Sequence, residues 1–158
     1  MRACKEQGNT VYLLTDKKIA DKHWLRDSIH ELFYVEEHAQ GYYDMHDVIA
    51  GLAHVMRDRP VDRIVALDDF DVEKAALLRE HFRIPGMGQT TARYFRDKLA
   101  MRTKAAEAGI RVPGFSGLFN DKAINEFIAT NPGPWMIKPR SEASATGIKK
   151  LHNEHDLW

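Results

Sequence analysis

The stretch that most constrains the fold lies near the end of the chain, at residues 134–150. It begins as an apolar run ending in Lys138, continues as a loop of small residues, and ends in a second run with paired lysines. Small residues let backbone N–H groups approach an anion closely, and flanking lysines supply positive charge. The stretch predicts either a phosphate-binding loop between two strands or an ordinary β-hairpin with a basic exposed face.

The first half of the chain alternates short apolar runs with amphipathic helical patterns. We expect strands at residues 11–15, 32–35 and 63–67, and helices at residues 21–28, 44–58 and 72–82. Asp44 is expected to cap the second of these helices. The run at residues 63–67 is nearly continuous, which is typical of a parallel strand covered on both faces. This alternation predicts an α/β fold with a parallel sheet and right-handed crossovers.

The first residues of the chain resemble the end of a helix. Residues 1–7 look like a helix tail stopped by Gly8, and a strand normally precedes such a helix, so we expect a missing first strand.

Asp68, Asp69 and Asp71 follow the expected strand at residues 63–67. Acidic residues at the carboxyl end of a parallel strand often face a ligand. The alternative is that they cap the next helix and interact with its dipole.

A turn-rich break at residues 84–88 divides the chain, and we place a domain boundary there, between residues 1–88 and residues 89–158. The second part is expected to contain one helix from Thr90 or Thr91 to Ala108, a strand at residues 115–119, and a helix at residues 121–129. Asn120 is expected to cap the helix at residues 121–129, and Asn153 to cap the start of another helix. The stretch at residues 134–150 then supplies the last two strands.

The composition excludes several classes of protein. Lys plus Arg and Asp plus Glu both number 23, and a formal net charge of +0 argues against a protein that neutralises many nucleic-acid phosphates. The single cysteine, Cys4, excludes an internal disulfide and suits a reducing compartment. No apolar run approaches the roughly 20 residues that span a bilayer, and the N-terminus lacks a secretory apolar core. We therefore expect a cytoplasmic protein without nucleic-acid or membrane partners.

Several motifs of the second part follow one another in a specific order. They are Arg96-Asp97-Lys98, Met101, residues 108–113, and residues 135–140 followed by the small-residue loop. Their order and spacing resemble the ATP-grasp superfamily, which includes biotin carboxylase and many carboxylate–amine ligases. The resemblance covers nearly the whole chain. It implies a Rossmann-like pre-ATP-grasp domain at residues 1–88 and an incomplete, α+β N-terminal portion of an ATP-grasp domain at residues 89–158.

The resemblance also implies a set of ATP-binding residues. These are Lys98, Lys138, Ser141, Ser144, Thr146 and Gly147. Lys98 would reach the phosphates, and Lys138 would contact the α-phosphate and the adenine side. The loop at residues 141–147 would close over the β- and γ-phosphates. A lysine suits this role because its ammonium is a mobile point charge. No catalytic residue and no metal ligand of this chain is implied.

Two departures from the family pattern qualify this interpretation. The loop has one glycine, Gly147, where carboxylase-type members have a glycine-rich run, so positive φ is costly elsewhere in the loop. This difference favours a ligase subgroup other than biotin carboxylase. Few residues follow Lys138, and we expect the Mg²⁺ ligands to lie in a C-terminal part that this chain lacks. His152 and His155 could together bind metal on a helix face, but the alternative is a solvated helix start.

As a whole, the resemblance implies ATP and Mg²⁺ as cofactors and a small-molecule carboxylate as substrate. The complete enzyme would activate the carboxylate as an acyl phosphate for attack by an amine or another nucleophile, and this chain alone would be inactive. The alternative is a non-catalytic nucleotide-binding or partner-docking module. A dinucleotide-binding domain is disfavoured because no Gly-x-Gly-x-x-Gly follows an expected strand. We also expect Trp135, Ile137 and Ile148 to form an exposed apolar face that favours a homodimer.

Overall fold

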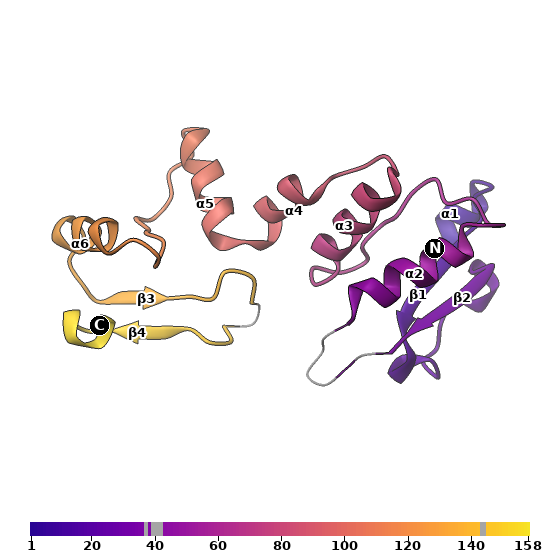
Figure 1. Ribbon diagram of the computed structural model, residues 1–158, viewed down its shortest axis with the longest axis horizontal. Helices are drawn as coiled ribbons and strands as arrows, with labels where there is room; N and C mark the ends of the chain where they lie inside the picture. The colour runs from indigo at the N-terminus through magenta and orange to yellow at the C-terminus, as the bar shows by residue number, and fades with distance from the viewer. Residues whose placement is uncertain (37, 39–42, 143–144) are drawn as a thin grey trace. The chain divides into compact units, whose positions relative to one another are not determined.

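The computed structural model describes residues 1–36, 38, 43–142 and 145–158 (Figure 1). The chain divides into two compact units, Met1–Pro60 and Val61–Trp158. A compact unit is not the same as a domain, so the predicted domain boundary at residue 88 stays a prediction.

The first unit is built on a parallel pair of strands. β1 (Tyr12–Asp16) pairs with β2 (Glu31–Val35) over five residues of each strand. α1 (Arg2–Glu6) precedes β1, and α2 (Met45–Val55) follows β2. A parallel ladder whose strands alternate with helices along the chain confirms the predicted α/β fold class.

Apolar side chains from both strands and α2 form the core of this unit. Leu13 and Val48 are buried, and the rings of Tyr12 and Phe33 pack edge to face with their centroids 6.1 Å apart. Asp44 caps α2, because its carboxylate accepts a hydrogen bond of 2.8 Å from a backbone N–H of the first turn. This cap was predicted from the sequence.

The helix predicted at residues 21–28 is wrong. Two short 3₁₀ helices, η1 (Lys17–Ile19) and η2 (Arg26–Ser28), border an irregular segment instead. The Trp24 indole N–H donates to the Ile19 carbonyl at 3.0 Å. A helix this short gains few hydrogen bonds to offset the cost of nucleation, so local side-chain bonds decide the conformation.

The second unit begins with a group of packed helices. α3 (Val72–Phe82) packs against α4 (Gln89–Arg96), which in turn contacts α5 (Lys98–Glu107). The buried residues of α3 and α4 include Ala75, Ala76 and Ala92, whose small side chains allow the helices to approach closely.

A hairpin follows these helices. β3 (Trp135–Ile137) and β4 (Lys149–Leu151) pair antiparallel, as expected for the two strands of the stretch at residues 134–150. α6 (Asp121–Thr130) precedes β3 and α7 (Glu154–Leu157) follows β4. The side chain of Asn120 caps α6 and that of Asn153 caps α7, each accepting a backbone N–H at 3.0 Å. Both caps were predicted.

Three other expectations for this unit are wrong. Within the described chain, residues 63–67 and 115–119 belong to no strand, and Val65 and Leu67 are 73% and 66% exposed. A strand needs a partner whose N–H and C=O groups face its own, and an apolar sequence does not supply one. The single helix expected to reach Ala108 is divided into α4 and α5, because Asp97 lies between them in an extended conformation.

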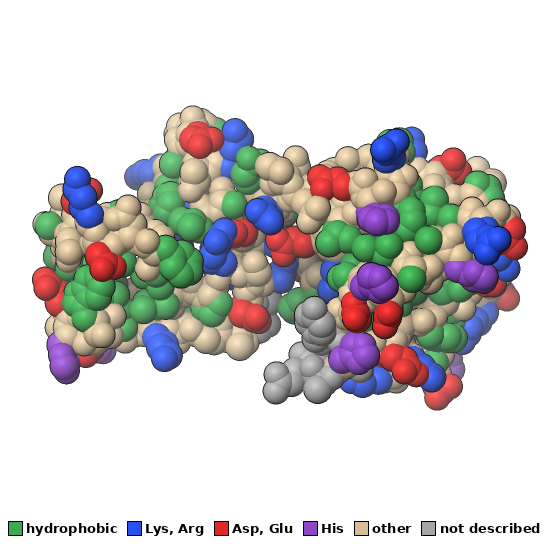
Figure 2. Space-filling view, viewed as in Figure 1, with side chains coloured by type: hydrophobic (Ala, Val, Ile, Leu, Met, Phe, Trp, Pro, Cys, Tyr) green, Lys and Arg blue, Asp and Glu red, His purple; other side chains and the backbone are tan. Residues whose placement is uncertain are grey.

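The surface of each unit mixes charge of both signs. On the face shown in Figure 2, Lys and Arg side chains are interspersed with Asp and Glu. Among the residues that the structure describes, no helix has the length and apolar character needed to cross a membrane. Trp135, Ile137 and Ile148, expected to be exposed, are half-buried, whereas Met136 is 51% exposed.

Candidate functional site

Residues 96–98, which we call the helix junction, connect α4 to α5. Asp97 has φ −84° and ψ 110°, which ends α4, and its carboxylate accepts hydrogen bonds from the N–H groups of Leu99 and Ala100 at 2.9 and 3.3 Å. An aspartate in this conformation is a favoured N-cap, so the same residue ends one helix and begins the next. Asp97 is only 5% exposed.

The buried carboxylate of Asp97 also binds an arginine of the loop that follows β3. Arg140 Nε donates to Asp97 Oδ1 at 3.0 Å, and Arg140 Nη2 donates to the other carboxylate oxygen. This two-pronged hydrogen bonding is the main reason that the pKa of Asp97 lies below its ordinary value, and the two helix N–H groups lower it further against the effect of burial. The same pairing raises the pKa of Arg140. The two groups are charged partners at neutral pH.

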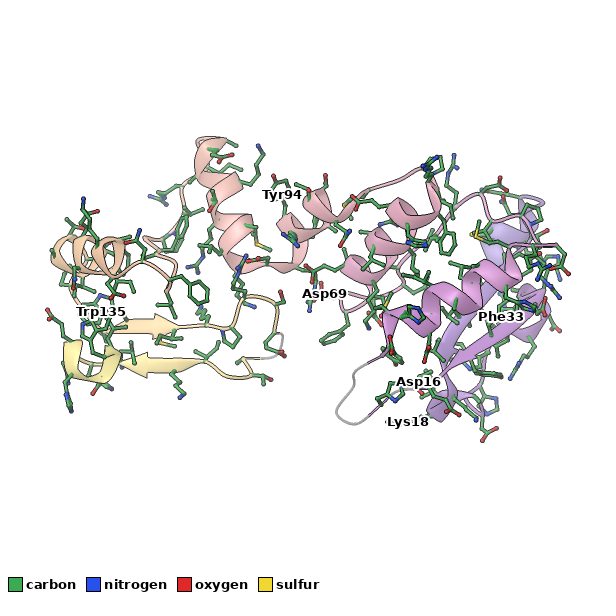
Figure 3. The ribbon with its side chains drawn as sticks, viewed as in Figure 1. Asp16, Lys18, Phe33, Asp69, Tyr94 and Trp135 are labelled. Atoms are coloured by element: carbon green, nitrogen blue, oxygen red, sulfur yellow. The ribbon has the colours of Figure 1, made fainter. Side chains whose placement is uncertain are left out.

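Arg96 is the first residue of the helix junction, and its side chain is only 9% exposed. Its guanidinium donates to the Ser141 carbonyl at 2.6 Å and forms an ion pair with Asp69. Asp69 is labelled in Figure 3, near the start of α3. The same guanidinium lies 5.1 Å from the ring centroid of Phe70, a cation–π distance. Asp69 therefore binds the helix junction, and of the three acidic residues before α3 it is the one that helps to build this site.

Lys98 contacts the same loop through its backbone and its side chain. Its N–H donates to the Arg140 carbonyl at 2.9 Å, and its ammonium donates to that carbonyl at 3.5 Å and to the Glu142 carbonyl. Residues 140–142, which we call the loop base, are thus hydrogen-bonded to the helix junction at each of their three positions. The ammonium of Lys98 points at the loop base rather than at open solvent.

Lys138 differs from Lys98 in the surroundings of its ammonium group. It is exposed, and within the described part of the chain its ammonium has no hydrogen-bond or ion-pair partner. It follows directly on β3, so a regular element fixes the position of its backbone. An exposed ammonium on a fixed backbone is available to an anion.

The described end of the loop is a turn at residues 145–147. Gly147 has φ +69°, and a Cβ at this position would lie 2.8 Å from Pro139 Cγ, so both backbone conformation and space require glycine. Ala145 also has positive φ, +61°, although the sequence suggested that only Gly147 would adopt it. Thr146 between them is exposed. Its hydroxyl and the exposed turn are therefore accessible to a ligand.

The two serines of the predicted site have different outcomes. Ser141 is half-buried, and the contact that the structure gives it is the bond from Arg96 to its carbonyl. Ser144 lies outside the described residues. The described members of the predicted set therefore separate into two groups. Lys98 and Ser141 lie where the helix junction meets the loop base, and Lys138, Thr146 and Gly147 lie on the accessible side of the loop.

The described residues do not form a ligand set for a divalent metal. No group of three or more His, Cys, Asp or Glu side chains comes together there. His155 lies in α7, and the N–H of His152 just before this helix donates to Asp156 at 2.8 Å, so the segment is a capped helix start. The described residues therefore do not fit Mg²⁺.

Sequence reasoning missed the roles of Arg96, Asp97 and Arg140. A signal for Asp97 existed, because an aspartate before Lys98-Leu99-Ala100 is a good N-cap followed by helix formers. No comparable local signal pairs Asp97 with Arg140, since they lie 43 positions apart in the sequence.

One curated relative matches the sequence over much of its length. The L-arginine-specific L-amino acid ligase of Bacillus subtilis is 36% identical over 110 residues, which are 68% of this chain and 27% of that protein. No family model matches the sequence.

Solved structures match nearly the whole chain. The biotin carboxylase domain of Hydrogenobacter thermophilus 2-oxoglutarate carboxylase, solved as a dimer with MgADP, ADP and bicarbonate, has a TM-score of 0.71 and 21% identity over 99% of this chain and 35% of that one. The L-amino acid ligase of Bacillus licheniformis has a TM-score of 0.67 and 15% identity over 97% of this chain and 35% of that one.

A third solved structure extends the same pattern. The ADP complex of N5-carboxyaminoimidazole ribonucleotide synthetase has a TM-score of 0.59 and 16% identity over 98% of this chain and 38% of that one. These three similarities establish the fold. This chain spans little more than a third of each solved chain and 27% of the curated relative.

Proposed function

We propose that this chain belongs to the ATP-grasp superfamily and forms the N-terminal part of the ATP site of a carboxylate–amine ligase. Its fold and its similarity to an amino-acid ligase support this proposal. In the complete reaction, a carboxylate oxygen attacks the γ-phosphorus of ATP, which gives an acyl phosphate and ADP. An amine or another nucleophile then attacks the acyl carbon, and phosphate leaves. The similarity to an L-amino acid ligase favours an amino acid as the carboxylate substrate.

In this proposal the described residues bind and position the nucleotide. The ammonium of Lys138, which has no partner among the residues that the structure describes, lies beside the loop and would neutralise phosphate charge there. The turn at residues 145–147 would offer backbone N–H groups and the Thr146 hydroxyl, and closure of the loop would exclude water from the γ-phosphate. Lys98 would hold the loop base through the Arg140 and Glu142 carbonyls and would offer its remaining ammonium N–H to the phosphates.

The observation that supports this proposal most strongly is the contact between the helix junction and the loop base. The Arg-Asp-Lys motif and the loop after β3 are far apart in the sequence, yet three successive residues of each are hydrogen-bonded together. Two cation-bearing motifs therefore converge on one loop. A polyphosphate that contacts both motifs would gain from two lysines on a single rigid support.

Nucleotide binding by the 158-residue chain tests the proposal. We expect ATP to bind in isothermal titration calorimetry, and Lys138→Ala to raise the dissociation constant about tenfold, the equivalent of one charge-assisted hydrogen bond. Lys122→Ala is the matched control, because Lys122 is also an exposed lysine but lies on α6. Equal affinity of all three proteins for ATP would overturn the proposal.

The proposed ligase function also makes a prediction about ATP hydrolysis by this chain alone. We expect no release of ADP from ATP by this chain, since its described residues bring together no ligand set for Mg²⁺. A non-catalytic nucleotide-binding module would bind ATP in the same way. The two are distinguished in a full-length protein that contains this chain, where only the ligase would release ADP when a carboxylate is added.

We also propose that the protein forms a homodimer in the cytoplasm. Large apolar side chains such as Leu118, Phe119 and Met136 are exposed in the second unit, and the single cysteine, Cys4, is a free thiol. Light scattering that gives the mass of a monomer at high concentration would contradict the dimer.

A further inference from the structure

We propose that Asp97 and Arg140 are a positioning pair, which sets nucleotide affinity by fixing the loop base without contacting the nucleotide. This inference rests on the proposed function, since it assigns a role within the same site. It concerns two residues that sequence reasoning left outside the site.

The carboxylate of Asp97 is engaged by groups of the protein through both of its oxygens. Its Oδ1 accepts from Leu99 N–H, Ala100 N–H and Arg140 Nε, and its Oδ2 accepts from Arg140 Nη2. The side chain is 7% exposed. A buried carboxylate with this set of donors is a structural acceptor, and its negative charge would repel a phosphate.

The pairing neutralises Arg140, whose guanidinium is otherwise a plausible phosphate ligand. Two of its nitrogens point at Asp97, while 53% of the side chain remains exposed. Bidentate pairing fixes the plane of the guanidinium as well as its position. The pair therefore holds the side chain of Arg140 against the start of α5.

Fixing Arg140 also fixes the residues on either side of it in the chain. Lys138 precedes it by two positions, and Pro139 between them restricts the backbone. On the other side, the Ser141 and Glu142 carbonyls accept from Arg96 and Lys98. The distance between the ammonium groups of Lys98 and Lys138 thus depends on the loop base. A small displacement of two groups that bind one ligand is enough to weaken binding.

Substitutions that remove one charge of the pair distinguish a positioning role from a direct contact with the nucleotide. In Asp97→Asn the side chain still caps α5, because asparagine is as good an N-cap as aspartate, but the charge pair is lost. Arg140→Gln removes the other partner. We expect each single variant to raise the dissociation constant for ATP about tenfold, and the double variant to raise it by the same factor, because both changes remove one interaction.

Two comparisons complete the design. Arg140→Lys keeps the charge but loses the bidentate geometry, so its affinity should lie between those of wild type and Arg140→Gln. The control is the exposed pair formed by Lys104 and Glu107 on the same helix, with 3.4 Å between the charged atoms. Neutralising either control residue with glutamine should leave the affinity for ATP unchanged.

The double variant decides the outcome for affinity. Losses that add up would show that Arg140 contacts the nucleotide independently of Asp97, and an unchanged affinity of Asp97→Asn would show that the pair is irrelevant to binding. Either result overturns the inference.

A measurement without nucleotide keeps the inference testable if wild type does not bind ATP. In that case the proposed function fails, and ¹⁵N relaxation of the free protein decides whether the pair fixes the loop. We expect the backbone order parameters of residues 140–142 and 145–147 to fall in Asp97→Asn, toward values of about 0.6 or below that mark flexible backbone. Unchanged order parameters would overturn the positioning role.

Discussion

The helix junction and the accessible side of the loop both carry charged side chains. The two regions differ in how those charges are satisfied. At the helix junction, Asp97 is buried and paired, and Arg96 is nearly buried between Asp69 and the Ser141 carbonyl. On the accessible side, the ammonium of Lys138 has no partner in the described part of the chain. Burial of a charge requires a partner inside the protein, whereas an exposed charge is free to find one outside. The difference separates residues that build the site from residues that are available to a ligand.

The largest expected effect comes from substituting Gly147, the one glycine of the loop. Gly147→Ala places a side chain at φ +69°, which costs about 1–2 kcal/mol, and moves a Cβ to 2.8 Å from Pro139 Cγ, which adds about 1–3 kcal/mol. We expect a lower free energy of unfolding, measured in urea, and weaker ATP binding.

Gly109→Ala is the matched control for this variant. Gly109 has φ +74° in the same unit, but nothing lies within 4 Å of an added Cβ. Gly109→Ala should therefore lose only the backbone part of the free energy and none of the affinity for ATP. Equal losses in the two variants would mean that contact with Pro139 contributes nothing.

The effect of pH on stability tests the other region. The pKa of Asp97 lies below its ordinary value of 3.8, so the carboxylate stabilises the fold above that pH and loses this contribution as pH falls through the lowered pKa. We expect the free energy of unfolding of wild type to decrease by about 1.5–3 kcal/mol from this group once it is protonated, as for a hydrogen bond to a charged partner.

Asp97→Asn isolates this contribution, because asparagine does not titrate. The difference in unfolding free energy between wild type and Asp97→Asn should be constant from neutral pH to about pH 4 and should shrink below it. Urea unfolding at several pH values measures this difference. A difference that is independent of pH would contradict the charged pairing with Arg140.

Elements whose signals are local were predictable from the sequence. The helix predicted at residues 72–82 is observed as α3. It was predictable because the apolar pattern that indicates it lies within the helix itself. The caps at Asn120 and Asn153 are equally local. The expected strand at residues 63–67 depended on a partner that no local pattern specifies, and in the described chain it has none. Local order was predictable, whereas the absence of a partner for residues 63–67 was not.

The same distinction applies to the candidate site. Lys138 and Gly147 were recognisable by residue type within one stretch, and the structure gives both an exposed position in or beside the loop. Lys98 was recognisable too, but its contacts with the loop base arise from residues more than 40 positions away. The pairing of Asp97 with Arg140 has the same long-range origin. Residue type thus indicated what was present, and only the fold indicated which charges were already satisfied.

The smallest expected effect concerns Ala145, which belongs to the accessible side of the loop but has a strained backbone. Its φ of +61° lies in the left-handed region, where glycine is favoured. Ala145→Gly relieves about 1–2 kcal/mol of strain and adds less than that in unfolded-state entropy, so a net gain of about 0.5–1 kcal/mol is expected in urea unfolding. Ala106→Gly in α5 is the control of opposite sign, because glycine inside a helix costs about 1 kcal/mol. A loss of stability in Ala145→Gly would mean that the turn does not hold Ala145 in the left-handed conformation. The accessible side of the loop would then be less ordered before a ligand binds than its contacts with the helix junction imply.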